Sequence, residues 1–204
     1  MIRSSASSDD ITPLLGEAAE LEGNYRWKEA AGIYERILRA MLLDDAKRLA
    51  INLRLALCLE NSAFQKDNAA AFRGEVEEAI AVYREMEEVI ERDSPWRYRA
   101  SAGRLHLESM LSKDGVTRRR LLDDAIDCER RVINEFERLG PSSELLEAGN
   151  FCLLILLERF YLNEGLEDIL KDGLALAERL AKSHVHDADI SARAYTNVLW
   201  AHMA

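Results

Sequence analysis

Apolar residues recur three and four positions apart through most of the chain, which is the spacing of one face of an α-helix. The segment 27–43 shows this face clearly: it carries Ala30, Ile33, Tyr34, Ile37 and Leu38. No sustained stretch alternates apolar and polar residues, and only 10 Gly and 3 Pro are present in 204 residues. Few helix breakers and a helical period together predict an all-α protein with long helices.

Turn-forming residues divide this pattern into four helical hairpins and a last unpaired helix. The first predicted helix begins between residues 10 and 13 and ends at Gly23-Asn24. The later ones are expected at about 27–43, 45–61, 76–92, 96–111, 119–139, 143–162, 166–182 and 188–203. The connection 62–73 is predicted to be partly helical. We expect residues 1–9 to be a flexible N-terminus and residues 10–204 to form a single domain.

Two stretches, 23–38 and 74–86, share one pattern of residue types. In each, a turn residue is followed by an apolar or aromatic anchor, two charged residues, a small Ala, and a Tyr four residues later on the same face. This spacing resembles the second helix of a tetratricopeptide repeat, a family of helical solenoids that bind other proteins. The residues taken as equivalent between hairpins are Ala30, Ala79, Ala125 and Ile169.

These equivalent positions lie 49, 46 and 44 residues apart, whereas the family's unit is about 34 residues. Longer helices or larger loops are therefore expected here. The predicted first helices keep only the family's small packing residues, at Ala18, Ala102-Gly103 and Ala148-Gly149. The resemblance implies a right-handed α-solenoid of about four stacked hairpins with long helices, plus a C-terminal helix.

The formal net charge of −10 disfavours nucleic acid as a partner, because binding phosphates requires a basic face. The charge differs between helices: 75–93 carries a net −6, 95–112 a net +2, and 45–61 a net +1. In a tetratricopeptide-like stack the first helices of the hairpins line the concave surface. The resemblance therefore implies a locally basic groove, and an ordinary solvated surface remains the alternative.

The predicted ligand-binding donors of this groove are Arg48, Asn52, Arg97, Arg104 and Asn150. Because Arg pairs with a carboxylate through two parallel hydrogen bonds, the expected partner is a protein or peptide that is acidic or bears a carboxylate. The paired Lys and Asn residues by which the family clamps a terminal carboxylate cannot be matched here residue by residue.

The function we predict is a protein–protein interaction module, a scaffold or adaptor that holds a partner in a concave groove and catalyses no reaction. One alternative is a regulatory or sensor segment of a larger signalling protein. Another is a helical enzyme or small-ligand binder with a pocket between hairpins. The C-terminal helix 188–203 has no partner in the pattern, so we expect either that it caps the fourth hairpin as a lone terminal helix, or that a homodimer or a continuation of the chain covers it.

Motifs for catalysis or cofactor binding are not found in the sequence. No Ser lies in a Gly-flanked elbow, no Gly-rich loop ends in Lys-Ser or Lys-Thr, and no Cys is close to a His, so we predict neither catalytic residues nor a cofactor. His184 and His186 lie near Asp187 and Asp189, which could be metal ligands, but we expect these acids to cap the last helix and predict no metal.

Two further charged segments have a simple helical interpretation. The eight acids of 75–93 are typical of a solvated outer face. The triplet Arg118-Arg119-Arg120 is expected to pair within its own helix with Asp123, Asp124 and Asp127, and so to leave no contact for nucleic acid.

Cysteine usage and the ends of the chain give an expected compartment. Cys58, Cys128 and Cys152 are odd in number and lie in apolar helical pattern, which favours buried thiols in a reducing compartment such as the cytoplasm. The Ser-rich residues 1–10 have no apolar run, and the apolar stretch 151–157 is too short to span a bilayer. We therefore predict a cytoplasmic protein without a membrane partner.

Overall fold

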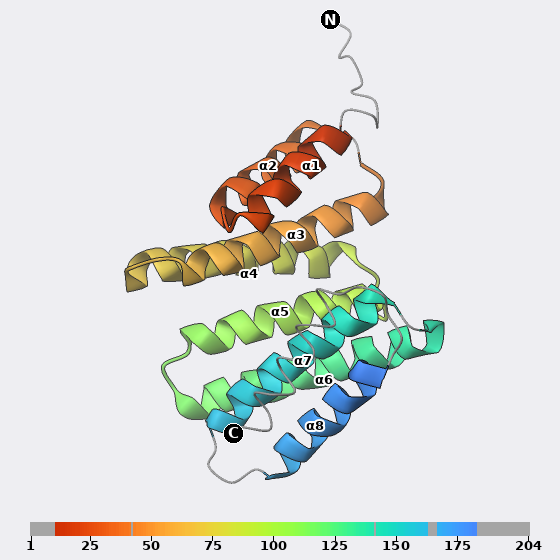
Figure 1. Cartoon of the computed structure of the whole chain (residues 1–204). Coiled ribbons are helices and arrows are strands. Elements are labelled where there is room, and N and C mark those ends of the chain that lie inside the picture. The colour runs from red at the N-terminus through yellow and green to blue at the C-terminus, as the bar shows by residue number, and fades with distance from the viewer. Residues whose placement is uncertain (1–10, 42, 141, 163–166, 183–204) are drawn as a thin grey trace, which may run out of the picture. The chain divides into compact units, whose positions relative to one another are not determined.

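The computed structural model describes residues 11–41, 43–140, 142–162 and 167–182. All the regular elements of these residues are helices (Figure 1), which confirms the all-α prediction. The chain divides into two compact units, Met1–Val89 and Ile90–Ala204, and each is described here by itself. The predicted flexible segment 1–9, the predicted last helix 188–203, and His184 and His186 lie outside the described residues.

The first unit contains α1 (Ile11–Gly23), α2 (Trp27–Ala40), α3 (Asp45–Phe64) and α4 (Ala69–Val89). The second unit contains α5 (Pro95–Leu111), α6 (Gly115–Leu139), α7 (Ser143–Tyr161) and α8 (Glu167–Lys182). Within each unit, the extensive contacts join helices that follow one another in the chain. Among the described residues, no helix has both the length and the apolar character needed to cross a bilayer.

Side-chain caps explain where several helices begin. The carboxylate of Asp44 accepts a hydrogen bond from the Lys47 amide (2.8 Å), and Asp114 accepts one from the Thr117 amide (2.8 Å). Each cap satisfies a backbone N–H that has no partner within the helix. Because Asp114 acts in this way, α6 begins at Gly115 and not at the predicted residue 119.

The connection between α3 and α4 is mostly helical, as predicted. Helix α3 continues to Phe64 and α4 already begins at Ala69, so only residues 65–68 form a turn. Asn68 Oδ1 accepts a hydrogen bond from the Ala71 amide (2.8 Å) and so starts α4. The earlier start lengthens the contact between α3 and α4 by about two helical turns relative to the predicted start at 76.

A small residue is buried where each helix meets its neighbours. These alanines are at most 1% exposed: Ala18, Ala30, Ala56, Ala79, Ala102, Ala125, Ala148 and Ala177. They include three of the positions that the sequence pattern treats as equivalent, at the corresponding place in α2, α4 and α6. A methyl side chain lets two helix backbones approach closely without a void.

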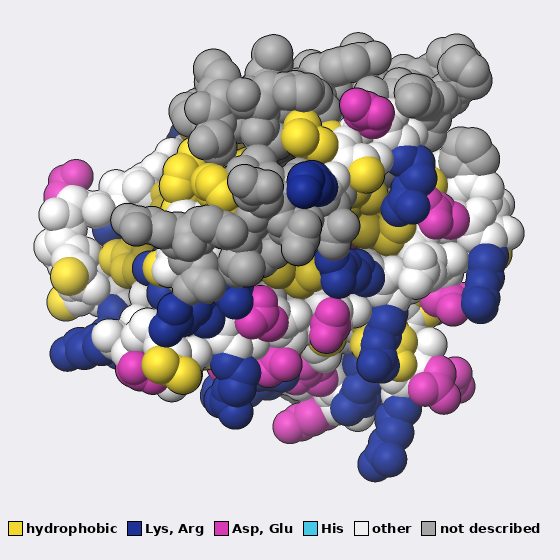
Figure 2. Space-filling model, turned by 90° about the horizontal axis from the view of Figure 1, so that it is seen from below, with side chains coloured by type: hydrophobic (Ala, Val, Ile, Leu, Met, Phe, Trp, Pro, Cys, Tyr) yellow, Lys and Arg dark blue, Asp and Glu magenta, His cyan; other side chains and the backbone are white. Residues whose placement is uncertain are grey.

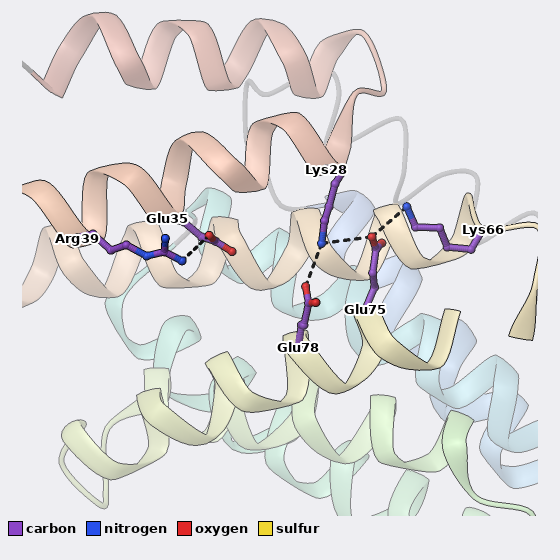
Figure 3. A network of polar contacts seen from close by, with 6 residues as sticks. All are labelled: Lys28, Glu35, Arg39, Lys66, Glu75 and Glu78. Atoms are coloured by element: carbon purple, nitrogen blue, oxygen red, sulfur yellow. Dashed lines mark hydrogen bonds and ion pairs between the residues drawn. The ribbon is translucent and has the colours of Figure 1, made fainter. Parts of the chain in front are cut away.

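A buried carboxylate links three segments of the first unit (Figure 3). Glu75 of α4 is only 7% exposed, and its Oε1 lies 3.3 Å from Lys28 Nζ of α2 and 2.9 Å from Lys66 Nζ of the α3–α4 turn. Lys28 Nζ also contacts Glu78 Oε2 at 2.9 Å. The prediction that all the acids of 75–93 form a solvated face is therefore wrong for Glu75, because this position on α4 faces α2 and the turn.

Replacement of Glu75 by Ala should lower the free energy of unfolding by about 1 to 3 kcal/mol, because two lysines lose a partially buried hydrogen-bonded partner. Replacement of the exposed Glu78 by Ala should change it by less than about 0.5 kcal/mol. Urea denaturation followed by circular dichroism measures both. Equal effects of the two substitutions would show that Glu75 acts as an ordinary surface charge.

Candidate functional site

A groove lies between α1 and α3 of the first unit and has a volume of about 480 Å³. Both helices pack on α2, and Tyr34 of α2 also lines the space between them. The residues that line the groove are Ile11, Thr12, Leu15, Tyr34, Lys47, Ala50, Ile51 and Arg54.

Helical spacing brings these side chains to one surface. Lys47, Ala50, Ile51 and Arg54 are three or four positions apart and therefore lie on one face of α3. The same holds for the apolar pair on α1, of which Leu15 is 37% exposed. The groove thus combines apolar walls, of which Leu15 and Ala50 are exposed, with two cations from a single helix.

A buried carboxylate holds one of these cations in place. Glu22 of α1 is 7% exposed, and its Oε1 accepts hydrogen bonds from Tyr34 Oη (2.7 Å), Arg54 Nε (3.2 Å) and Cys58 Sγ (3.5 Å). Arg54 Nη2 pairs with the other carboxylate oxygen of Glu22. These contacts connect α1, α2 and α3, and they fix the orientation of the guanidinium at the groove.

The donors to Glu22 stay protonated at neutral pH. Burial raises the pKa of Tyr34 to about 12 and the pKa of Cys58 to about 11, so each keeps the hydrogen that it donates. The Cys58 thiol is correspondingly a poor nucleophile. The hydrogen bonds of Glu22 under the groove therefore hold the Arg54 guanidinium in one orientation.

Both cations retain capacity to bind a ligand. The Arg54 side chain is 45% exposed, and its Nη1 makes no hydrogen bond to any residue that the structure describes. Lys47 contacts Asp44 at 3.3 Å, but both side chains are more than half exposed, so the pair is weak. Groups of this kind beside an apolar wall suit a segment that carries both a carboxylate and an apolar side chain.

Neither of the donors predicted on α3 lines this groove. Arg48 is exposed and Asn52 is half-buried, on a neighbouring face of the helix. One residue along an α-helix turns the side chain by about 100°, so the change from Arg48 to Lys47 moves the cation to another face. The alternation of cations and apolar residues in Lys47-Ala50-Ile51-Arg54 is the sequence signal that could have identified the right face.

The other three predicted donors belong to the second unit. Arg97 Nη1 donates a hydrogen bond to the backbone carbonyl of Ile90 (2.8 Å), and Arg104 Nη1 pairs with Glu108 Oε2 (2.9 Å). Asn150 is half-buried on α7. A shared groove for all five predicted residues stays a prediction, because they are divided between units that are described separately.

The second unit contains a completely buried glutamate. Glu129 of α6 is 0% exposed, and its Oε1 accepts a hydrogen bond from Arg99 Nη1 of α5 (2.7 Å). The Arg99 guanidinium also lies over the Phe151 ring of α7, 4.4 Å from its centre. Burial raises the pKa of Glu129 to about 7, although the neighbouring Arg99 favours the charged form.

A second set of polar contacts joins α7 to α5 and α6. His106 Nε2 lies 3.1 Å from Glu158 Oε1, and Arg118 Nη2 lies 3.8 Å from Glu158 Oε2. Arg159 binds Asp123 through two contacts of 2.6 and 3.1 Å. The expectation that Arg118 and Asp123 pair within α6 is therefore wrong, because α7 supplies an oppositely charged partner for each. These contacts hold three helices together.

A cavity of about 380 Å³ lies between α6, α7 and α8. It is lined by Arg130, Ile133, Asn134, Cys152, Leu156, Ala175, Leu176 and Arg179. Burial raises the pKa of Cys152 to about 12, so the thiol is protonated and unsuited to nucleophilic attack. Arg179 Nε contacts Glu137 Oε1 at 3.0 Å, so this arginine, like Arg54, already has one carboxylate partner.

The face seen in Figure 2 does not single out another site by its charge. On the face seen in Figure 2, Lys and Arg side chains lie among Asp and Glu side chains, and no large area of one sign is visible on the described residues. In the same part of the chain, no group of three or more His, Cys, Asp or Glu side chains could hold a metal ion. The groove between α1 and α3 is the best candidate.

No model of a known protein family matches this chain, and no curated protein matches it either.

Replacement of Glu129 by Gln should reduce the pH dependence of stability. A carboxyl group with a raised pKa binds its proton more tightly in the folded state, so wild-type protein loses stability as the pH rises from the ordinary value of 4.5 through about 7. This shift corresponds to a loss of up to about 3 kcal/mol. The glutamine variant should equal the wild type near pH 5 and be more stable at pH 8.

Urea denaturation at several pH values between about 5 and 8 measures this difference. Replacement of Glu147, an exposed carboxylate on α7, by Gln is the matched control and should leave the wild-type pH dependence unchanged. If the Glu129 variant loses stability with rising pH as steeply as the wild type, the buried carboxyl is not the titrating group.

Proposed function

We propose that this protein is an interaction module of tetratricopeptide-like, stacked helical hairpins, and that the groove between α1 and α3 binds an acidic peptide segment of a partner protein. The carrying observation is the apolar groove between two first helices, with Lys47 and Arg54 in its lining. Within each unit, extensive packing between consecutive helices supports the repeat architecture, because solenoid repeats contact mainly their neighbours.

The spacing of the two cations gives the expected form of the ligand. Lys47 and Arg54 are seven residues apart on α3, which corresponds to about 10 Å along the helix axis. An extended peptide covers this distance in about three residues. Since alternate side chains of an extended peptide share one face, two carboxylates four positions apart can reach both cations through the long Lys and Arg side chains, while the apolar side chain midway between them lies against Leu15 and Ile51.

A small-ligand binder is the second candidate, and the cavity between α6, α7 and α8 favours it. Its volume of about 380 Å³ is within the range of small-molecule sites, and Arg130 and Arg179 in its lining would favour an anion. The groove of the first unit is preferred because the buried carboxylate of Glu22 holds Arg54 in a fixed orientation at the groove.

The three free cysteines, two of them buried, support a reducing compartment such as the cytoplasm.

Replacement of Lys47 by Glu should weaken the binding of an acidic peptide by about tenfold or more, which is about 1.4 kcal/mol. Replacement of Arg48 by Glu is the matched control: both residues are exposed, adjacent and on the same helix, and both substitutions change the charge equally. The control should change affinity by less than about threefold, through long-range repulsion only.

The probe for this measurement is a peptide selected from a random display library and then titrated by fluorescence anisotropy at low and moderate salt. We expect the selected sequences to carry two acids around an apolar residue. If Arg48→Glu weakens binding more than Lys47→Glu, the ligand occupies the face of α3 that carries Arg48 and Asn52. Equal effects would leave only a diffuse attraction to positive charge.

A further inference from the structure

The guanidinium of Arg54 is held along one edge. Its Nε donates to one oxygen of the Glu22 carboxylate (3.2 Å) and its Nη2 pairs with the other oxygen, which is the two-point geometry of an arginine and a carboxylate. The side chain is still 45% exposed, and none of the aromatic rings that the structure describes lies over it. Arg54 therefore presents a planar cation in a fixed orientation to the groove.

The second unit contains the same pair of groups together with an aromatic ring. Arg99 Nη1 donates to the buried carboxylate of Glu129 (2.7 Å), and the Arg99 guanidinium lies over the Phe151 ring, 4.4 Å from its centre. A guanidinium is attracted to the negative face of an aromatic ring, and its plane stacks on that face. The pair of Arg54 and Glu22 has no such ring from the described part of the chain, so a ligand can supply it.

The walls of the groove suit an aromatic side chain beside Arg54. Leu15 and Ala50 are exposed, and the buried Ile51 lines the groove between the two cations. Ala50 lies one helical turn before Arg54 on the same face of α3, and its side chain is only a methyl group. A flat ring can therefore approach the guanidinium from this side while its edges contact the apolar walls.

We propose that the groove selects an aromatic residue in its acidic ligand, and that the ring stacks on the guanidinium of Arg54. The inference rests on the proposed function, because this ring is the apolar side chain that lies midway between the two carboxylates. Midway along the groove is about 5 Å from Arg54 along the helix axis, within the range of about 6 Å over which a cation attracts a ring. The expected ligand has the order acid, any residue, aromatic residue, any residue, acid.

Two capped peptides test the aromatic preference. Both have the order Glu-Ser-X-Ser-Glu, with phenylalanine at X in one and cyclohexylalanine in the other. The two side chains have a similar shape, but the saturated ring has no π electrons and is the more hydrophobic. Titration of wild-type protein by fluorescence anisotropy should show about three- to tenfold tighter binding of the phenylalanine peptide. Burial of apolar surface alone would favour the cyclohexylalanine peptide.

Replacement of Arg54 by Lys tests whether the preference belongs to the guanidinium. Lysine keeps the charge and can pair with Glu22, but it has no planar group, so the preference for phenylalanine should fall below about twofold. Arg48→Lys is the matched control, because Arg48 is an exposed arginine of the same helix outside the groove. This variant should keep the full preference, and circular dichroism checks that both variants are folded.

Nuclear magnetic resonance of wild-type protein gives a readout that needs no substitution. A ring stacked on the guanidinium shifts the Arg54 Nε–H resonance upfield through its ring current. The phenylalanine peptide should cause this shift, and the cyclohexylalanine peptide should not.

The outcomes separate this inference from the proposed function. If wild-type protein binds both peptides equally, or the cyclohexylalanine peptide more tightly, the aromatic preference is overturned and the acidic groove remains. A full preference in the Arg54→Lys variant would overturn the role of Arg54. If neither peptide binds but acidic peptides from the display library do, only the aromatic pattern fails. If no acidic peptide binds, the proposed function fails with it.

Discussion

The close approach of neighbouring helices is the constraint on which both units depend. A helix backbone can lie near another only where the side chain between them is small, and every described helix supplies a buried alanine at such a point. Ala30 and Ala79 have this role in the first unit, and Ala125 has it in the second. The larger residues around each alanine then fill the space beside the contact, as Ile37 and Met86 do. A larger side chain at the alanine would separate the helices and open these layers.

Buried carboxylates also fix the position of one helix along its neighbour within each unit. Glu22 holds Arg54, Glu75 holds two lysines, and Glu129 holds Arg99, each across an interface between helices. Apolar contacts alone tolerate sliding of one helix along another, whereas an ion pair of this kind is satisfied at one position. Since desolvation offsets much of the attraction, these pairs contribute more to the choice of helix position than to the free energy of unfolding.

The sequence predicts the helices well because their signals are local. The 3.6-residue period, the turn at residues 23–26 and the capping residue Asp114 each act within a few residues. The burial of Glu75 depends on lysines that are 47 and 9 residues away in the chain, and no local pattern distinguishes it from its exposed neighbours. The groove could not be predicted from local patterns for the same reason. Whether Lys47 or Arg48 faces it depends on how α3 is oriented about its own axis in the folded unit.

The left-handed backbone conformation of Tyr25 could not be predicted from a sequence pattern either. Gly23 and Asn24 are the residues that usually adopt a left-handed conformation, yet the helix continues through Gly23 and the chain reverses two residues later. The reason is the set of backbone hydrogen bonds that closes the turn, which places Arg26 opposite Leu21.

The order of helix contacts along the chain also bears on how the protein is made. Every extensive contact of the first unit joins segments within its first 89 residues, and each joins one helix to the next. Contacts between nearby segments form quickly, because little chain entropy is lost when they close. The first unit can therefore complete its packing while the ribosome is still synthesising the second. A nascent chain of this kind exposes one helix face at a time to solvent.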